Sequence, residues 1–357
     1  MRRARPFFIL AGLGSFLLPL GCQVDYFGHL VAGELASLCR TVPVAEALED
    51  PRLTDEERAK LALTQEARQF GIEQSGLFAG QAYTVFEMNG TEPAAYVISA
   101  SAKDSLTPFL WDFPFIGLSG AKGFFDREMG QREADSLAAA GYDVLYSQAD
   151  GFSTLGLLAD PVRQSNLLLD EIDLVELILH EMTHSTVYKP SDSNFSESLA
   201  TFVGRAAAQD WFDASFGIDS AEAGAAQTRF ADKVVIDEYV NAVFAEMTQY
   251  YEQAAAAGLS RDTIIAGRET RFEAAADRFE TEFRPRLMDL DRWQHIGEIE
   301  LDNVRLLAAI RYQGSLSDYQ AVLDQTAGNL AEALAVFAQA AARPDSREFL
   351  RNWAAEP

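Results

Sequence analysis

The sequence predicts a mainly α-helical α+β protein, with a small β-sheet, a pair of buried central helices and a long helical C-terminal part. Three observations predict this fold class. Apolar residues recur at helical spacing over most of the chain, short β-type runs gather between residues 83 and 147, and the chain beyond about residue 218 is rich in alanine and charge. With 357 residues and 48% hydrophobic content, the chain can bury a substantial core.

The charge balance excludes one large class of partners. The 29 basic and 54 acidic residues give a formal net charge of −25, which repels phosphate backbones and anionic lipid headgroups. We therefore expect no nucleic-acid binding. The acidic residues are spread along the chain without a long run, which is typical of a solvated surface.

The first residues have the features of an export signal. Arg2, Arg3 and Arg5 precede the apolar run FFILAGLGSFLLPL, which ends just before Gly21 and Cys22. The run is too short for a comfortable membrane span. We expect residues 1–21 to be a signal peptide.

The stretch LPLGC resembles a bacterial lipobox, in which the cysteine is lipidated and becomes the mature N-terminus. Pro19 stands where such boxes usually have leucine. The resemblance implies a body tethered through Cys22 to a membrane of the bacterial cell envelope and facing the periplasm. The alternative is an ordinary cleaved signal with an incidental cysteine. An unmodified Cys22 would be able to pair with Cys39, the chain's other cysteine.

The N-terminal half alternates between helices and strands. Helices are expected over 27–39 and 54–70, the second opening with the capping-box sequence TDEE. The runs 83–88 and 94–100 are predicted strands, and the turn residues NGTEP between them suggest a hairpin. A helix over 126–141 ends at a glycine, and a further strand follows at 142–147.

Two helices form the predicted centre. The segment 170–188 begins with aspartates that favour the helix dipole, and its middle is apolar nearly all round, which indicates a buried helix. After the loop KPSDSN, the sequence SESLATFVGRAAAQDWF begins a second helix.

The C-terminal part is predicted to be entirely helical. Residues 218–287 suggest a long helical hairpin that is interrupted near Ala257 and Gly258. Further helices are expected over 291–312, 315–327 and 329–342, the last two with serine and asparagine caps. We expect a core over 22–216 and a helical region over 217–357 that packs on it as one continuous unit.

The central helix carries the pattern H-E-x-x-H. His180 and His184 lie one turn apart on the same face, which lets two imidazoles hold one zinc ion. Glu181 would lie beside the metal, placed to take a proton from the water that the metal activates. Two histidines and a glutamate in an apolar segment each need a partner, and a metal supplies one for both rings.

A catalytic zinc ion usually has three protein ligands, so a third must come from elsewhere. Glu197 is the candidate, because a loop and a turn can fold the next helix back onto the first and Ala200 is small enough for close approach. The alternative is a local capping box between Asn194 and Glu197. His29 and His295 lie in no comparable pattern and are poorer ligands.

At these residues the chain resembles a known family. HEMTH followed by NFSESLATF is similar to the gluzincin arrangement of zinc metallopeptidases. The wider pattern resembles a bacterial family of predicted aminopeptidases, many of them lipoproteins, over nearly the whole mature chain. The stretches that carry this wider resemblance are DFPFIGLSGAKGFF, GYDVLYSQADGFSTLGLLADP, LILHEMTHSTVY, FSESLATFVG and LDNVRLLAAIRY.

The resemblance implies one zinc ion held by His180, His184 and Glu197, with Glu181 as the catalytic base. Two positions depart from the related patterns. Ser196 stands where the family commonly has asparagine before the third ligand, and Thr201 stands where thermolysin-like enzymes place an aspartate that orients a histidine.

Substrate-binding groups are harder to identify. Tyr188, Asn303 and Tyr312 are candidates for stabilising the transition state or contacting substrate, although each also has a structural interpretation. The strand YDVLYS, with its loop GFSTLG, is a candidate edge for binding an extended peptide.

The expected activity is zinc-dependent hydrolysis of peptide bonds in a peptide or protein substrate. The aminopeptidase label comes from the resemblance alone, and an endopeptidase is equally compatible with the residues. The alternative from another class is a non-catalytic, zinc-stabilised envelope lipoprotein that acts as a scaffold or a chaperone-like binding protein. Glu181 argues against it, because a scaffold needs the ligands but not the base.

Overall fold

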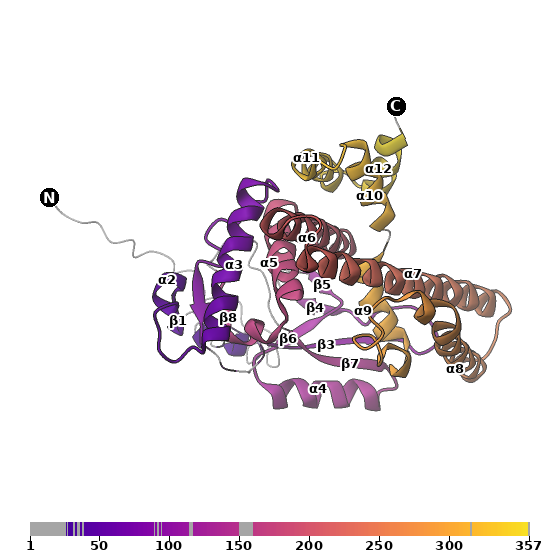
Figure 1. The fold of residues 1–357 in the computed structure, drawn as a ribbon. Helices are drawn as coiled ribbons and strands as arrows, with labels where there is room; N and C mark the ends of the chain where they lie inside the picture. Colours follow the sequence, from indigo (N-terminus) through magenta and orange to yellow (C-terminus); the bar gives the residue numbers. More distant parts are fainter. Residues whose placement is uncertain are drawn as a thin grey trace.

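Helices make up most of the chain in the computed structural model, and small sheets of two or three strands complete it (Figure 1). The structure describes residues 26, 28–30, 33, 36–37, 39–88, 90, 93, 95–113, 117–149, 160–314 and 316–355. The predicted mainly helical α+β class is confirmed.

Some predictions fall outside this part of the chain. The signal peptide, Cys22 and the loop GFSTLG all lie outside the described residues. Cys39 is exposed and is a free cysteine in the described structure. No helix among the described residues is both long enough and apolar enough to cross a membrane.

The strands form three separate sheets. Their bounds are β1 Thr41–Pro43, β2 Val85–Glu87, β3 Ala95–Ser101, β4 Trp111–Phe113, β5 Gly117–Ser119, β6 Lys122–Phe124, β7 Asp143–Ala149 and β8 Val162–Arg163. The sheet orders are β1-β2-β8, β6-β3-β7 and β4-β5.

The predicted hairpin between residues 83 and 100 is wrong. β2 pairs with β1 in antiparallel and with β8 in parallel fashion, whereas β3 lies in another sheet between β6 and β7. The turn residues between β2 and β3 therefore connect two sheets. Turn chemistry predicts a change of direction, but not which strand will accept the hydrogen bonds.

Two predicted helix caps are present, and the predicted serine cap, Ser315, lies outside the described residues. The bounds of the helices are α2 Val44–Ala47, α3 Asp55–Glu73, α4 Arg127–Ala139, α5 Glu171–Thr186, α6 Ser193–Phe216, α7 Ala221–Ala256, α8 Arg261–Arg278, α9 Asn303–Gln313, α10 Leu316–Gln325, α11 Leu330–Ala341 and α12 Ser346–Ala355. The Thr54–Glu57 capping box is present at α3, and Asn329 caps α11. The remaining short elements are the 3-10 helices η1 Gln164–Leu168, η3 Arg284–Arg286 and η4 Ile296–Glu298 and the π-helix η2 Phe279–Phe283.

The region between α8 and α9 differs from the prediction of one helix over 291–312. The carboxylate of Asp232 on α7 is fully buried and accepts hydrogen bonds from the backbone N–H groups of Met288 and Asp289 and from the indole of Trp293. These bonds hold the segment in an irregular path across α7. Asp302 then caps α9, which begins only at Asn303. The break between α7 and α8 comes at Gly258, whose φ is +64°, as the sequence predicts.

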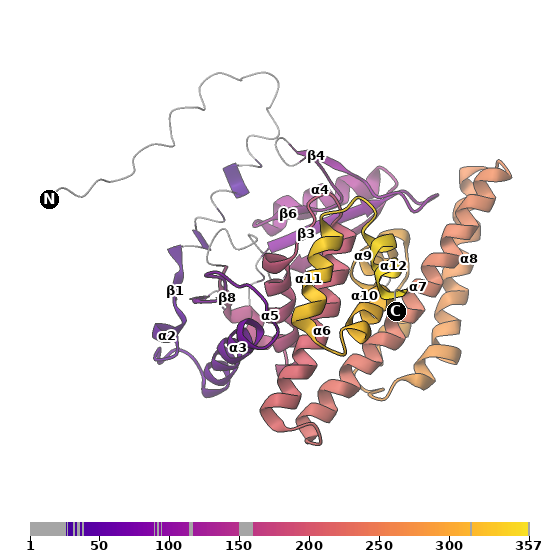
Figure 2. The same ribbon diagram turned by 90° about the horizontal axis from the view of Figure 1, so that it is seen from above.

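The layers place α5 and α6 at the centre of the molecule (Figures 1 and 2). α3 packs on one side of α5, α4 covers the sheet β6-β3-β7, and the antiparallel α7–α8 hairpin extends away from the centre. The C-terminal helices α10, α11 and α12 lie over α6. Tyr319 on α10 joins these C-terminal helices to α6, because its ring packs on Phe195 and Phe202 and its hydroxyl donates to the carbonyl of Phe195 at 3.1 Å.

Candidate active site

Helix α5 presents the two histidines of the H-E-x-x-H pattern from a buried support. Asp170 caps the helix by accepting the N–H of Asp173. The apolar residues Leu174, Ile178 and Met182 are buried to 1% exposure or less, which fixes the helix in the core. His180 and His184 lie in its last two turns, as the spacing requires.

Helix α6 returns alongside α5 and brings Glu197 to the histidines. Its N-cap is Asp192, which accepts the N–H of Phe195. Asn194 is therefore already inside the helix, and the alternative of a capping box between Asn194 and Glu197 is wrong. Ser196 holds the tight connection, because its hydroxyl accepts the N–H of Lys189 at 3.0 Å.

A glycine sets how closely the two helices approach. A Cβ atom added at Gly204 would lie 3.1 Å from the Cα, Cβ and N atoms of His180. Ala200, one turn earlier on α6, is fully buried. Ala200 was predicted from the sequence to allow this approach, whereas Gly204 was not. A small residue seven positions after Glu197 is the signal that was available.

The three candidate donors converge. The Nε2 atoms of His180 and His184 lie 3.6 and 3.4 Å from Oε2 of Glu197. One ligand atom from each of the three side chains lies within 4.8 Å of the others. This is the only such group of three histidine, cysteine or acidic side chains in the described part of the chain. Two imidazoles and a carboxylate are a donor set that suits zinc.

We call His180, His184 and Glu197 the trio. The pKa shifts of Glu197 and His184 show how strongly the groups of the trio interact. Burial disfavours the charged form of Glu197, but hydrogen bonds with His180 and His184 outweigh it and lower the pKa of Glu197 to about 2. Burial alone would lower the pKa of His184, whereas the hydrogen bond with Glu197 and the charges of Glu181 and Glu197 raise it above its usual 6.5. The site therefore favours a cationic partner for the carboxylates.

In the described structure, the Nδ1 atom of His184 lacks the hydrogen bond that usually orients a metal-binding histidine. This atom is buried and has no hydrogen-bond partner among the described residues. Metal-bound histidines usually donate this N–H to a carboxylate or carbonyl. Thr201 is buried at the position where the thermolysin-like pattern has aspartate, so this part of the site departs from that pattern.

Two of the three tyrosine and asparagine candidates lie beside the trio. The ring of Tyr312 on α9 lies 6.3 Å from that of His180, and the ring of Tyr188 lies 6.2 Å from that of His184. Tyr312 has 42% of its surface exposed. Even so, desolvation by the surrounding protein and the charges of Glu197 and Glu181 raise its pKa to about 12.

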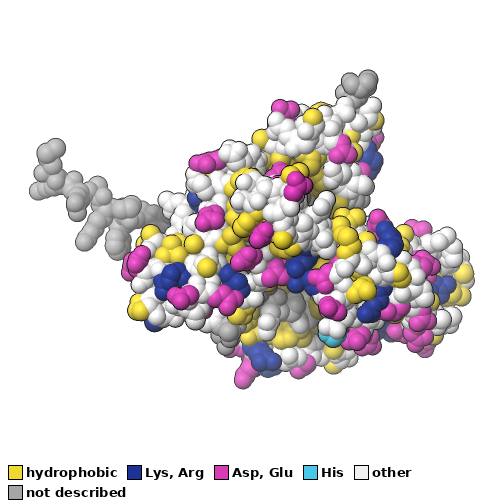
Figure 3. All heavy atoms as spheres, in the orientation of Figure 1, with side chains coloured by type: hydrophobic (Ala, Val, Ile, Leu, Met, Phe, Trp, Pro, Cys, Tyr) yellow, Lys and Arg dark blue, Asp and Glu magenta, His cyan; other side chains and the backbone are white. Residues whose placement is uncertain are grey.

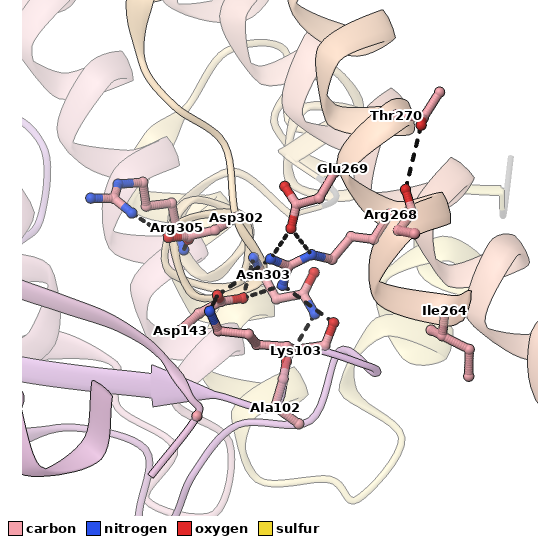
Figure 4. Close-up of polar contacts among 12 residues, drawn as sticks. Ala102, Lys103, Asp143, Ile264, Arg268, Glu269, Thr270, Asp302, Asn303 and Arg305 are labelled. Carbon is pink, nitrogen blue, oxygen red and sulfur yellow. Dashed lines mark hydrogen bonds and ion pairs between the residues drawn. The ribbon is translucent and has the colours of Figure 1, made fainter. Parts of the chain in front are cut away.

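Asn303 lies in a different cluster, which corrects its expected role as a substrate contact (Figure 4). It is fully buried at the start of α9, about 14 Å along the helix from Tyr312. Its Oδ1 accepts the hydroxyl of Tyr251 at 2.8 Å, and its Nδ2 donates to the carbonyls of Ala102 and Ser105. The amide is fully used in joining α9 to the loop after β3.

The other two histidines and β7 take the following places. Nε2 of His29 accepts the N–H groups of Phe125 and Asp126 at the start of α4, and His295 is exposed beside Glu298. Neither lies in the trio. β7, the candidate edge for substrate, pairs with β3 along its full length and has no second partner strand in the described structure.

Tyr83 is a strained, buried residue that the sequence did not reveal. It is buried, and its φ of +62° is rare for a residue with a side chain. Its N–H donates to the carbonyl of Asp160 at 2.7 Å, and its carbonyl accepts the amide of Gln65 at 2.9 Å. Burial and then the charge of Glu181 raise the pKa of the phenol well above 10. Such strain concentrates at functional sites, but no sequence pattern marks this tyrosine.

Comparisons with known proteins agree with the resemblance seen in the sequence. Residues 25–350 match the family model described as "Putative aminopeptidase". No curated protein and no solved structure matches the chain. The match spans most of the chain and includes the two histidines, Glu181 and Glu197. The chain therefore belongs to this aminopeptidase family.

Proposed function

We propose that the protein is a zinc-dependent peptidase in which His180, His184 and Glu197 hold the metal. One observation carries the proposal: the Nε2 atoms of the two histidines and a carboxylate oxygen of Glu197 converge from two helices. Three protein ligands of this type leave a position open, as catalytic zinc sites do. The family description supports hydrolysis of peptides and the aminopeptidase class.

The residues of the chain would divide the reaction between them. When bound, zinc polarises the scissile carbonyl and lowers the pKa of water towards about 7. Glu181 follows a ligand but is not one of the three donors, so it is free to take the proton from the attacking water and pass it to the leaving amine. Tyr312, whose pKa of about 12 keeps its phenol protonated at neutral pH, is the candidate donor to the developing oxyanion.

A pair of conservative substitutions tests this division. Glu181→Gln removes the base and should lower kcat by about 10²- to 10⁴-fold while the bound zinc stays unchanged. Tyr312→Phe should lower kcat by about 10²- to 10³-fold with little change in KM. Fluorogenic peptides, assayed with and without chelator, provide the measurement. Equal turnover by the wild type and Glu181→Gln would contradict the mechanism, and zinc binding without any hydrolysis would favour a zinc-stabilised scaffold.

We also propose that the protein acts in the bacterial envelope, held at a membrane through a lipid on Cys22. The supporting features are the basic residues Arg2, Arg3 and Arg5, the apolar run and the sequence LPLGC. The mass of the mature N-terminal peptide tests this. A diacylated or triacylated cysteine is the expected result, and an unmodified residue at this position would contradict it.

A further inference from the structure

A groove lies between α6, α7 and α10. Its volume is about 930 Å³, within the range of about 300–1,000 Å³ that is typical of ligand pockets. One face of α7, from Gln227 to Asn241, forms its long side, which is about 21 Å at 1.5 Å per residue. Residues of α6 and one face of α10 form the other sides. Figure 3 shows hydrophobic side chains gathered below the C-terminal helices on this side of the molecule.

The groove combines an apolar surface with amide groups. Phe202, Phe230 and Val234 supply apolar surface, and Val234 is 49% exposed. Five amide side chains also line it: Gln209, Gln227, Asn241, Gln313 and Gln320. The Oε1 atoms of Gln209 and Gln313 are buried and have no hydrogen-bond partner in the described structure. Apolar contacts with a few polar groups of this kind suit a peptide, which has both apolar side chains and backbone N–H groups.

The charge of the groove favours a basic occupant. Its charged lining residues are Arg205, Asp237, Glu238 and Asp324, so one positive and three negative groups give a net charge of −2. Arg205 forms ion pairs with Asp237 and Glu176, and Glu238 pairs with Arg286 outside the lining, so Asp324 is the charged lining group that has no ion pair among the described residues. The whole chain carries −25. An acidic occupant would therefore be repelled, and a basic one attracted.

The groove meets the candidate active site at the end of α9. Tyr312 lies beside His180, and the next residue, Gln313, lines the groove. Asn241 also joins α7 to α9, because its amide donates to the carbonyl of Gln313 at 2.9 Å. One end of the groove therefore lies one residue along α9 from Tyr312.

We propose that this groove is an exosite, meaning a substrate-binding surface away from the scissile bond, for a polypeptide segment with apolar and basic side chains. The proposal rests on the proposed peptidase function, because it assigns the groove to the same substrate. Its length of about 21 Å accommodates about six extended residues at 3.3 Å each. Long peptides should therefore bind through it, whereas single-residue substrates should not.

A direct binding measurement tests the groove without relying on turnover. The probe is a fluorescein-labelled peptide of about ten leucine and lysine residues, with binding to the Glu181→Gln protein followed by fluorescence anisotropy. In that background, Val234→Arg places a positive charge in the groove and should weaken binding about tenfold. Ile218→Arg is the matched control, because Ile218 is 75% exposed, lies outside the groove lining and changes the net charge equally. Equal affinity of the two variants would overturn the proposal.

Kinetics separate this proposal from the peptidase function itself. In the otherwise wild-type protein, Val234→Arg should raise KM about tenfold for a long basic peptide and leave a single-residue fluorogenic substrate unchanged. If Val234→Arg and the wild type have the same KM and kcat on both substrates, the exosite is refuted and the peptidase function stands. If the wild-type protein hydrolyses neither substrate, the peptidase function fails, and the anisotropy comparison still decides whether the groove binds peptide.

Discussion

Two polar clusters in this protein differ in where their positive charge comes from. At the junction of β7, α8 and α9, Asp143 is buried beside Arg268, which is itself 3% exposed, and Asn303 completes the network (Figure 4). At the junction of α5 and α6, two histidines and Glu197 face one another with no lysine or arginine paired to them among the described residues. The first cluster carries its own cation, whereas the second offers donors to one.

This difference separates a structural cluster from a candidate metal centre. In the first, Arg268 donates to Asp143 and Glu269, and the amide of Asn303 is fully used. In the second, a buried nitrogen of His184 has no partner and only carboxylates balance the imidazoles. Buried charges must be paired or bind metals. The comparison therefore predicts that the two clusters respond differently to mutation.

The largest effect on stability is expected in the structural cluster. Arg268→Met leaves the buried Asp143 with Lys103, 3.7 Å away, as its one remaining ion-pair partner among the described residues, and should lower the free energy of unfolding by about 3–5 kcal/mol. Zinc binding should not change, because α5 and α6 do not contribute to this cluster. Denaturant unfolding and metal analysis provide the two readouts.

Arg284→Met is the matched control for that substitution. Arg284 and Glu280 form a partly exposed pair, with side chains 33% and 44% exposed. Its loss should cost about 0–1 kcal/mol. If the two variants were equally stable, the buried pair would contribute no more than a surface pair. The assignment of a structural role to the Asp143–Arg268 cluster would then be wrong.

A smaller effect is expected where α6 touches α5. Gly204→Ala adds a Cβ atom 3.1 Å from backbone atoms of His180, so α6 must shift, which should cost about 1–3 kcal/mol of stability and weaken zinc binding. Gly224→Ala on α7 is the control. No atom lies within 4 Å of its added Cβ, and it should gain about 0.5–1 kcal/mol. Unchanged zinc affinity in Gly204→Ala would show that this contact does not position the ligands.

The smallest predicted effect is a change with pH. In the metal-free protein, the pKa of Glu197 is lowered from 4.5 to about 2, so its stabilisation is present above pH 4.5 and is lost as the pH falls towards 2. The pKa of His184 is raised above 6.5, so its stabilisation is present below pH 6.5 and is lost as the pH rises through the folded-state pKa. Glu197 and His184 together thus stabilise the metal-free protein most between pH 4.5 and 6.5.

The affinity for zinc should instead increase as the pH rises, because protons compete with the metal for the histidines. The rise in Tm on adding zinc should therefore be larger at about pH 8 than at about pH 5. Thermal unfolding with and without zinc measures it. A rise in Tm that is independent of pH would place the metal on groups other than these histidines.

Much of the fold and the candidate site followed from local patterns in the sequence. The caps at Thr54 and Asn329, and the break at Gly258, depend on neighbouring residues, and the structure has them where they were expected. The helix predicted from 170 begins at Glu171, with Asp170 as its cap. The H-E-x-x-H spacing placed His180 and His184 on one helix face, and the short loop brought Glu197 back to them. That these residues bind zinc stays a prediction.

The features that the sequence missed depend on contacts between distant segments. β2 and β3 entered different sheets because strand partners are chosen by tertiary packing. The late start of α9 depends on Asp232, a residue 71 positions before Asn303, and helix α12 was not predicted at all. The positive φ of Tyr83 and the groove beside α7 likewise arise only when separate elements pack together.

Zinc affinity, measured by titrating the metal-free protein in competition with a chelator, tests the central claim most directly. The wild type and Glu181→Gln should each bind one zinc ion tightly, whereas Glu197→Ala and His184→Ala should lose that affinity while remaining folded. If Glu197→Ala binds zinc as tightly as the wild type, or if the wild type binds none, then α5 and α6 do not form a metal centre.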